Sequence, residues 1–161
     1  MNSNSPEKRV LQLIDADDED NGADVRELRS LFDALAPIQP SELLGDWSGG
    51  DFHGYGEKAT HPLHAMLETY RWAGMLVESF EDAKPVMTWT DEGMRVENEY
   101  WGRAVIRELK MRDVLSACCI FDRWPIFYHF RRVSDSTIMG MTEFKDDAMK
   151  QAGDYYFWIR K

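Results

Sequence analysis

After residue 73 the chain consists of short segments rich in apolar residues, separated by polar turns, and this pattern predicts β-strands. The predicted strands span residues 75–80, 86–90, 94–100, 104–111, 114–121, 125–133, 137–144 and 155–160. Short polar turns such as Asp91-Glu92-Gly93 and Ser134-Asp135-Ser136 separate them. With a further strand from Gly45, we expect a mainly β fold, a closed antiparallel barrel of about eight or nine strands, because closure removes exposed sheet edges.

Two segments show the helical period instead. The clearer one spans residues 24–36, where Asp24 and Glu27 match a capping box and Pro37 follows the end. Its apolar positions fall on one face: Val25, Leu28, Leu31, Phe32 and Leu35. The second predicted helix spans residues 62–72, and we expect it to cap the mouth of the barrel.

The sequence predicts two parts of unequal size. Residues 1–23 form an expected mobile, acidic arm with a possible short helix after Ser5-Pro6. Its acidic run does not match an EF-hand, because Leu28 falls where the loop needs a bidentate Glu. Residues 24–161 form the expected single barrel domain.

A tryptophan between glycines marks the start of the barrel. In the stretch Gly45-Asp46-Trp47-Ser48-Gly49 the glycines permit a wide ring to enter a crowded corner. A Gly-x-Trp of this kind is typical of the first strand of lipocalins, where the Trp closes one end and stacks on an Arg of the last strand. We therefore expect Arg160 to stack on Trp47, with Arg131 as the competing partner.

This stretch resembles the signature of GXWXG-domain proteins. The later segments Phe121-Asp122-Arg123-Trp124-Pro125-Ile126, His129-Phe130-Arg131-Arg132-Val133 and Tyr156-Phe157-Trp158-Ile159-Arg160 resemble the domain of unknown function that follows it in bacterial proteins. The two halves would span residues 45–101 and 102–161. The resemblance implies a small lipocalin-like or calycin-like barrel that holds a small apolar molecule, and it carries over no catalytic residue.

The net charge limits the classes of binding partner, and the two cysteines indicate the redox state. The net charge of −10 on 161 residues argues against nucleic acid and against an anionic membrane surface. Cys118 and Cys119 are adjacent, so a disulfide between them is geometrically poor and free thiols are expected. With no apolar run long enough to span a membrane, we expect a cytoplasmic monomer or homodimer.

Strand 125–133 carries most of the candidate chemistry. Its alternation places Phe127, His129 and Arg131 on one face, and Tyr128 on the other. Arg131, His129 and Tyr128 would form the polar end of a ligand chamber and could hold a carboxylate head group. The predicted ligand-binding residues are Arg131, His129, Tyr128, Phe127, Met139, Met141 and Trp158, and the signature residues are Gly45, Trp47, Gly49 and Arg160.

Other interpretations remain open at this point. A buried Arg131 needs a partner, so an internal salt bridge to a carboxylate would explain the same residues without a ligand. As an alternative to binding alone, His129 with Asp122 would form a general acid/base pair in an isomerase or hydrolase. A third alternative is a protein-interaction module that uses helix 24–36.

The sequence contains no clear motif for a metal site or a cofactor site. His53, His61 and His64 are close in sequence, but their spacing does not suit a helical metal site. The glycines at 49, 50, 54 and 56 lack the strand–turn–helix context of a nucleotide site. We expect no metal and no cofactor.

Overall fold

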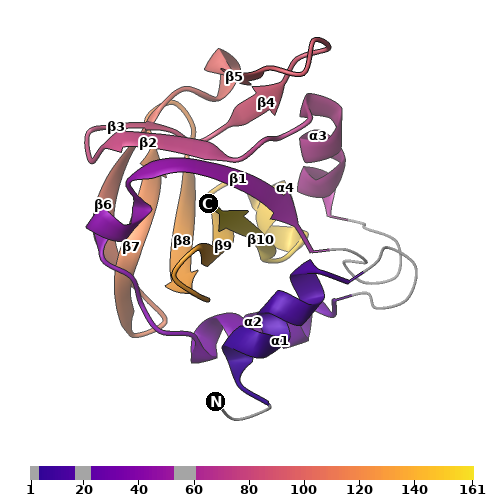
Figure 1. The fold of residues 1–161 in the computed structure, drawn as a ribbon, viewed down its shortest axis with the longest axis vertical. Coiled ribbons are helices and arrows are strands. Elements are labelled where there is room, and N and C mark those ends of the chain that lie inside the picture. Colours follow the sequence, from indigo (N-terminus) through magenta and orange to yellow (C-terminus); the bar gives the residue numbers. More distant parts are fainter. Residues whose placement is uncertain (1–3, 17–22, 53–60) are drawn as a thin grey trace.

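Eight antiparallel strands close into a barrel in the order β1-β10-β9-β8-β7-β6-β3-β2 (Figure 1). The computed structural model describes residues 4–16, 23–52 and 61–161. The barrel strands are β1 (Gly45–Asp51), β2 (Met75–Ser79), β3 (Asp82–Lys84), β6 (Ala104–Met111), β7 (Val114–Phe121), β8 (Ile126–Arg132), β9 (Thr137–Phe144) and β10 (Tyr155–Arg160). The predicted closed antiparallel barrel is confirmed.

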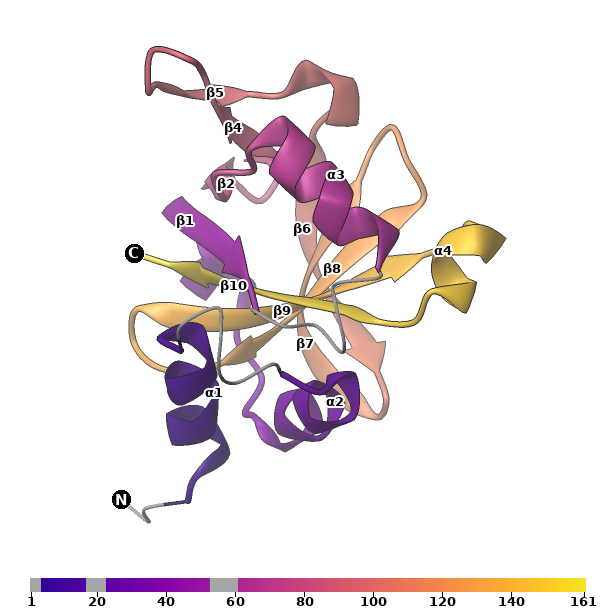
Figure 2. The same cartoon turned by 90° about the vertical axis from the view of Figure 1, so that its right-hand side faces the viewer.

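The other elements surround this barrel (Figure 2). They are the helices α1 (Pro6–Ile14), α2 (Val25–Ala34), α3 (Pro62–Tyr70) and α4 (Asp147–Gln151), the 3₁₀ turns η1 (Pro40–Leu43) and η2 (Glu99–Trp101), and the two-stranded sheet of β4 (Met87–Trp89) and β5 (Arg95–Glu97). The prediction that segments 86–90 and 94–100 belong to the barrel is wrong, because β4 and β5 form a separate two-stranded sheet, with one isolated bridge from Thr88 to Trp72. In their place β3, which the sequence pattern does not predict, completes the ring.

The strand register defines two faces of the sheet. In β9, Gly140 lies opposite Phe130 of β8 and Phe157 of β10. A Cβ on Gly140 would come within 2.2 Å of the Phe157 ring, so only glycine leaves room for that ring. Phe157 also packs edge-on against Trp72. This aromatic layer fills the middle of the barrel with the protein's own side chains.

The outer face of β8, β9 and β10 is buried as well, under α1 and α2. Phe32 of α2 is fully buried and packs against Tyr156 of β10. In α1, the apolar residues Val10 and Leu13 are also buried. The expectation of a mobile arm over residues 1–23 therefore does not describe α1, which joins the core, while the acidic residues 17–22 lie outside the described part of the chain.

Candidate functional site at the mouth of the barrel

Helix α3 lies across one end of the barrel, in front of the strands in Figure 2. His61 caps its start, because its Nδ1 accepts the backbone N–H of Leu63 at 3.1 Å, and Pro62 occupies the first helical position. The helix ends at Tyr70, and the capping residue Arg71 has a φ of 51°, in the left-handed region. Short capping signals thus set the length of the helix that covers the mouth.

A hydrogen-bond network around Asp51 attaches α3 to the barrel. The Asp51 carboxylate accepts the Tyr155 hydroxyl of β10 at 2.7 Å and contacts Nδ1 of His64 on α3. The other ring nitrogen of His64 lies 3.2 Å from Glu68 one helical turn later. The network joins α3 to β1 and β10, and the sequence analysis did not find it.

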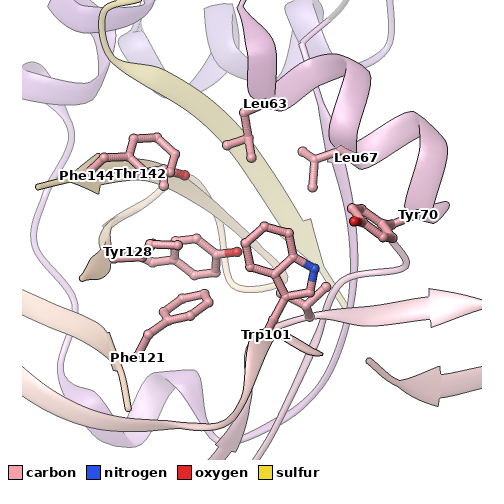
Figure 3. Close-up of a pocket in the computed structure, with 10 residues that line it drawn as sticks. Leu63, Leu67, Tyr70, Trp101, Phe121, Tyr128, Thr142 and Phe144 are labelled. Carbon is pink, nitrogen blue, oxygen red and sulfur yellow. The ribbon is translucent and has the colours of Figure 1, made fainter. Parts of the chain in front are cut away.

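Beneath α3 lies a small, partly open cavity of about 20 Å³ (Figure 3). Its walls come from α3, from the inner faces of the barrel strands and from the loops beside them: Leu63, Leu67, Tyr70, Val86, Trp101, Phe121, Ile126, Tyr128, Thr142 and Phe144. A volume of this size admits one water molecule or one small terminal group. None of these lining residues carries a charge.

A larger groove of about 290 Å³ adjoins the cavity on the outside. The two share four lining side chains, Leu63, Trp101, Ile126 and Phe144. The rest of the groove is formed by Met66, Tyr100, Trp124, Pro125, Asp146 and Met149. Its volume falls at the lower end of the range for small-molecule pockets, roughly 300 Å³.

Three hydroxyl-bearing residues line the inner cavity: Tyr70 is 38% exposed, whereas Tyr128 and Thr142 are buried. Tyr128 of β8 and Thr142 of β9 lie directly opposite each other in the strand register, so their side chains share the inner face. The Thr142 Oγ1 is buried and has no hydrogen-bond partner within the described structure. Burial raises the pKa of Tyr128, which keeps its phenol neutral.

Two family models match this chain, each over a different region. Residues 30–93 match the model of the GXWXG protein family, and residues 102–161 match a domain of unknown function, DUF4334. The chain therefore combines a GXWXG region with an adjoining DUF4334 domain. A solved structure, described as the crystal structure of a protein from Thermomonospora curvata, superimposes with a TM-score of 0.84 at 29% identity over 97% of both chains. No curated protein matches the sequence.

The residues that give the GXWXG family its name hold the other end of the barrel. Trp47 is buried, and its Nε1–H donates to the carbonyl of Leu43 in η1 at 2.8 Å. A Cβ on Gly49 would lie 2.4 Å from the Trp72 ring, so that position requires glycine. Gly45, the remaining signature residue, has a φ of +124°, which disfavours any side chain.

The expected stacking of Arg160 on Trp47 is wrong. The register pairs Arg160 with Ser48 and places its guanidinium 5.5 Å from the centre of the Trp158 ring. The Nζ of Lys161 lies 4.5 Å from the centre of the Trp47 ring and donates to the carbonyl of Leu44. Arg131, the second candidate, instead stacks on Phe32 at 4.6 Å.

Most of the predicted ligand-binding residues lie on the outer face of the sheet. Only Tyr128 lines the inner cavity. By the strand register, the face opposite to Tyr128 carries Phe127, His129, Arg131, Met139, Met141 and Trp158. The expectation that Arg131, His129 and Tyr128 share one chamber is therefore wrong, because adjacent strand residues point to opposite sides.

The outer-face polar residues contact the protein itself. Arg131 is 1% exposed, donates through Nη1 to the Phe130 carbonyl at 3.0 Å and leaves Nε and Nη2 without partners in the described structure. Burial lowers its pKa, and Arg112 adds repulsion. The predicted salt bridge from Arg131 to a carboxylate is likewise not formed within the described residues.

His129 and Asp122 do not form the acid/base pair that was considered. His129 Nε2 lies 2.5 Å from the Glu143 carboxylate, and burial lowers the pKa of the imidazole despite that contact. The Asp122 carboxylate instead accepts the backbone N–H of Arg103 at 3.0 Å. The two residues therefore serve separate local contacts.

The described histidines of the set His53, His61 and His64 do not form a metal site either. His53 lies outside the described residues, whereas the Nε2–H of His61 donates to the Gly153 carbonyl at 3.0 Å. Across the described residues, no group of three His, Cys, Asp or Glu side chains is arranged to hold a metal ion. No described helix is long and apolar enough to cross a membrane.

Sequence reasoning missed Thr142 as a site residue, although it predicted the helix over residues 62–72 that covers the mouth. A signal for Thr142 was present, because it is the one hydroxyl-bearing residue among the alternate positions Ile138, Gly140, Thr142 and Phe144 of β9. Assigning those positions to the inside would have required knowing that α2 covers the other face.

Proposed function

We propose that this protein binds a small, mainly apolar molecule at the mouth of its barrel, in the groove and cavity beneath α3. The observation that carries the proposal is the apolar groove of about 290 Å³ next to an inner cavity of about 20 Å³, with four lining residues in common. The interior further down is packed with aromatic rings, so the mouth is the better place for a ligand than the barrel centre.

The groove has the composition of a ligand site. Tyr100, Trp101 and Trp124 form an aromatic cluster with ring centres 5.3 to 6.4 Å apart. Flat rings of this kind provide a large contact area at low entropic cost. Met66 of α3 and Met149 of α4 also line the groove, and methionine side chains adapt readily to different apolar shapes.

The alternatives have less support. An isomerase or hydrolase based on His129 and Asp122 would need the two side chains in one cavity, and they make separate contacts. An interaction module based on helix 24–36 would need a free apolar face on α2, but Leu28 and Phe32 are fully buried against the protein. Binding of a small molecule therefore remains the function that the geometry favours.

The test uses N-phenyl-1-naphthylamine, a neutral apolar dye whose fluorescence rises on leaving water. We expect the wild-type protein to bind the dye saturably, and Leu63→Trp to weaken binding at least tenfold by filling the space shared by groove and cavity. Leu115→Trp, at an exposed position on β7, is the matched control and should bind as the wild type does. Met66→Trp fills the groove from a partly buried position and serves if Leu63→Trp does not fold.

Two results would overturn the proposal. One is an absence of saturable dye binding by the wild type, together with a native mass spectrum that shows only the bare chain. The other is equal affinity of the wild type and both groove-filling variants.

A further inference from the structure

The unpartnered hydroxyl of Thr142 requires an explanation. A buried hydroxyl without a hydrogen bond costs roughly 1–3 kcal/mol relative to one that is satisfied. Thr142 is 3% exposed, and its Oγ1 has no partner within the described structure. Valine has nearly the same shape without this cost, so the hydroxyl is unfavourable for folding unless something else binds it.

Tyr128 places a second hydroxyl at the same cavity. Its ring extends from β8 into the cavity, as Figure 3 shows. The row of residues across β8, β9 and β10 is Tyr128, Thr142 and Tyr155. Tyr155 donates to Asp51 at 2.7 Å, whereas no hydrogen bond links the Tyr128 hydroxyl to another residue of the described chain.

The described linings of the cavity and the groove also contain almost no charged side chains. The cavity's described lining contains no Lys, Arg or His, and the groove outside it contributes only Asp146 as a charged residue. An ionised carboxylate in such surroundings would be desolvated without a counter-ion, at a high free-energy cost. A neutral carbonyl or hydroxyl would accept or donate hydrogen bonds at these groups without that penalty.

We infer that the cavity recognises an uncharged, hydrogen-bonding head group, such as a ketone or an alcohol, and that Tyr128 and Thr142 are its specificity residues. The inference rests on the proposed function and adds the chemistry of the ligand. The apolar body of the molecule occupies the groove against Trp101 and Trp124. Its terminal oxygen enters the 20 Å³ cavity, which has room for one such group. This recognition replaces the carboxylate anchor that the sequence suggested at Arg131.

The experiment compares three probes with equal numbers of non-hydrogen atoms: 2-acetylnaphthalene, 2-isopropylnaphthalene and 2-naphthoate. Each competes against N-phenyl-1-naphthylamine. We expect the ketone to bind roughly three- to tenfold more tightly than the isopropyl compound, the ratio that one net hydrogen bond provides. The carboxylate should bind most weakly.

Isosteric variants identify the residues. Tyr128→Phe and Thr142→Val should each reduce the ketone preference while they leave affinity for the isopropyl compound unchanged or improved. Thr142→Ser keeps a hydroxyl and should retain the preference. Thr137→Val, at a buried threonine on the opposite face of the same strand, should leave all three affinities unchanged.

The outcomes separate this inference from the proposed function. If none of the probes and not even the dye binds, the proposed function fails. If the isopropyl compound binds as well as the ketone, the cavity holds only a trapped water and the inference fails while apolar binding stands. Tighter binding of 2-naphthoate would also overturn the inference, and so would a ketone preference that survives both isosteric variants.

Discussion

The two faces of strand β8 are covered by different parts of the protein. This difference separates residues that stabilise the fold from residues that line the proposed ligand site. The inner face, with Tyr128, borders a cavity under a helix that spans the mouth. The outer face, with His129 and Arg131, is covered by α1 and α2. His129 and Arg131, the residues that the sequence favoured for binding or catalysis, thus lie on the face that packs against the helices.

The polar groups on the two faces also differ in character. On the outer face, the His129 imidazole contacts Glu143, and the Arg131 guanidinium is stacked on Phe32. On the inner face, the polar groups are neutral hydroxyls beside empty space. We therefore expect outer-face substitutions to change stability and inner-face substitutions to change ligand binding.

The largest expected effect is at Phe32. Phe32→Ala should lower the free energy of unfolding by about 3–5 kcal/mol, because the ring is fully buried and is the contact that holds α2 over Arg131. Urea denaturation followed by tryptophan fluorescence measures this loss. Leu31→Ala, at a partly buried neighbour on α2, should cost less than half as much. A small loss in Phe32→Ala would contradict the structural role given to the outer face.

Acidification should destabilise the protein from both faces. Burial lowers the pKa of His61 at the mouth and of His129 on the outer face, so both are held neutral in the folded state. Their contribution to stability is complete above the ordinary histidine pKa of about 6.5 and is lost as the pH falls below it, because the unfolded chain then binds more protons.

The urea midpoint, measured between pH 8 and pH 5, checks this expectation. His129→Gln should reduce the fall of the urea midpoint between pH 7 and pH 5. His61→Asn, which keeps a side chain suited to the helix cap, should reduce it separately. A wild-type midpoint that stays constant between pH 7 and pH 5 would contradict the burial of neutral histidines.

The barrel itself was predictable because β6, β7, β9 and β10 are short segments rich in apolar residues that end at polar turns. Predicted and observed bounds agree for 104–111, 114–121, 137–144 and 155–160. Pairing partners were harder to predict where strands are short. The three-residue strand β3 is fixed by its neighbours rather than by its own pattern, and β4 and β5 are too short to show whether they join the ring.

The orientation of β8 was not predictable, because both of its faces are buried. One face packs in the barrel and the other under the helices, so alternation gives no contrast between inside and outside. The same reason explains why Met139 and Met141 were expected to line the cavity. Which cation stacks on Trp47 depends on the register between β1 and β10. A shift of one residue in that pairing decides between Arg160 and Lys161.

A smaller effect, with an unusual sign, is expected at two threonines of β9. Thr142→Val should raise the free energy of unfolding by about 1 kcal/mol in the absence of ligand, because it removes an unsatisfied hydroxyl. Thr137 is the matched control on the opposite face, and its Oγ1 accepts the Arg160 Nε–H at 3.2 Å. Thr137→Val should lower stability by a similar amount. Equal signs for the two variants in urea denaturation would contradict the contrast between satisfied and unsatisfied groups.

The smallest effect is expected at Arg131, the residue that the sequence favoured as a ligand anchor. Its guanidinium is buried with two unpartnered nitrogens, and replacement of a poorly paired buried charge by an apolar side chain is often neutral or stabilising. Arg131→Met should therefore keep the free energy of unfolding within about 1 kcal/mol of the wild type or increase it.

The comparison for Arg131 is Arg112→Met. Arg112 donates through Nε to Asp33 at 2.8 Å, so its loss leaves a carboxylate without its partner and should destabilise the protein. Neither variant should change the affinity for N-phenyl-1-naphthylamine, because both side chains belong to the outer face. A tenfold loss of dye affinity in Arg131→Met, with Arg112→Met unaffected, would move the ligand site to the outer face and reverse the roles of the two sides of β8.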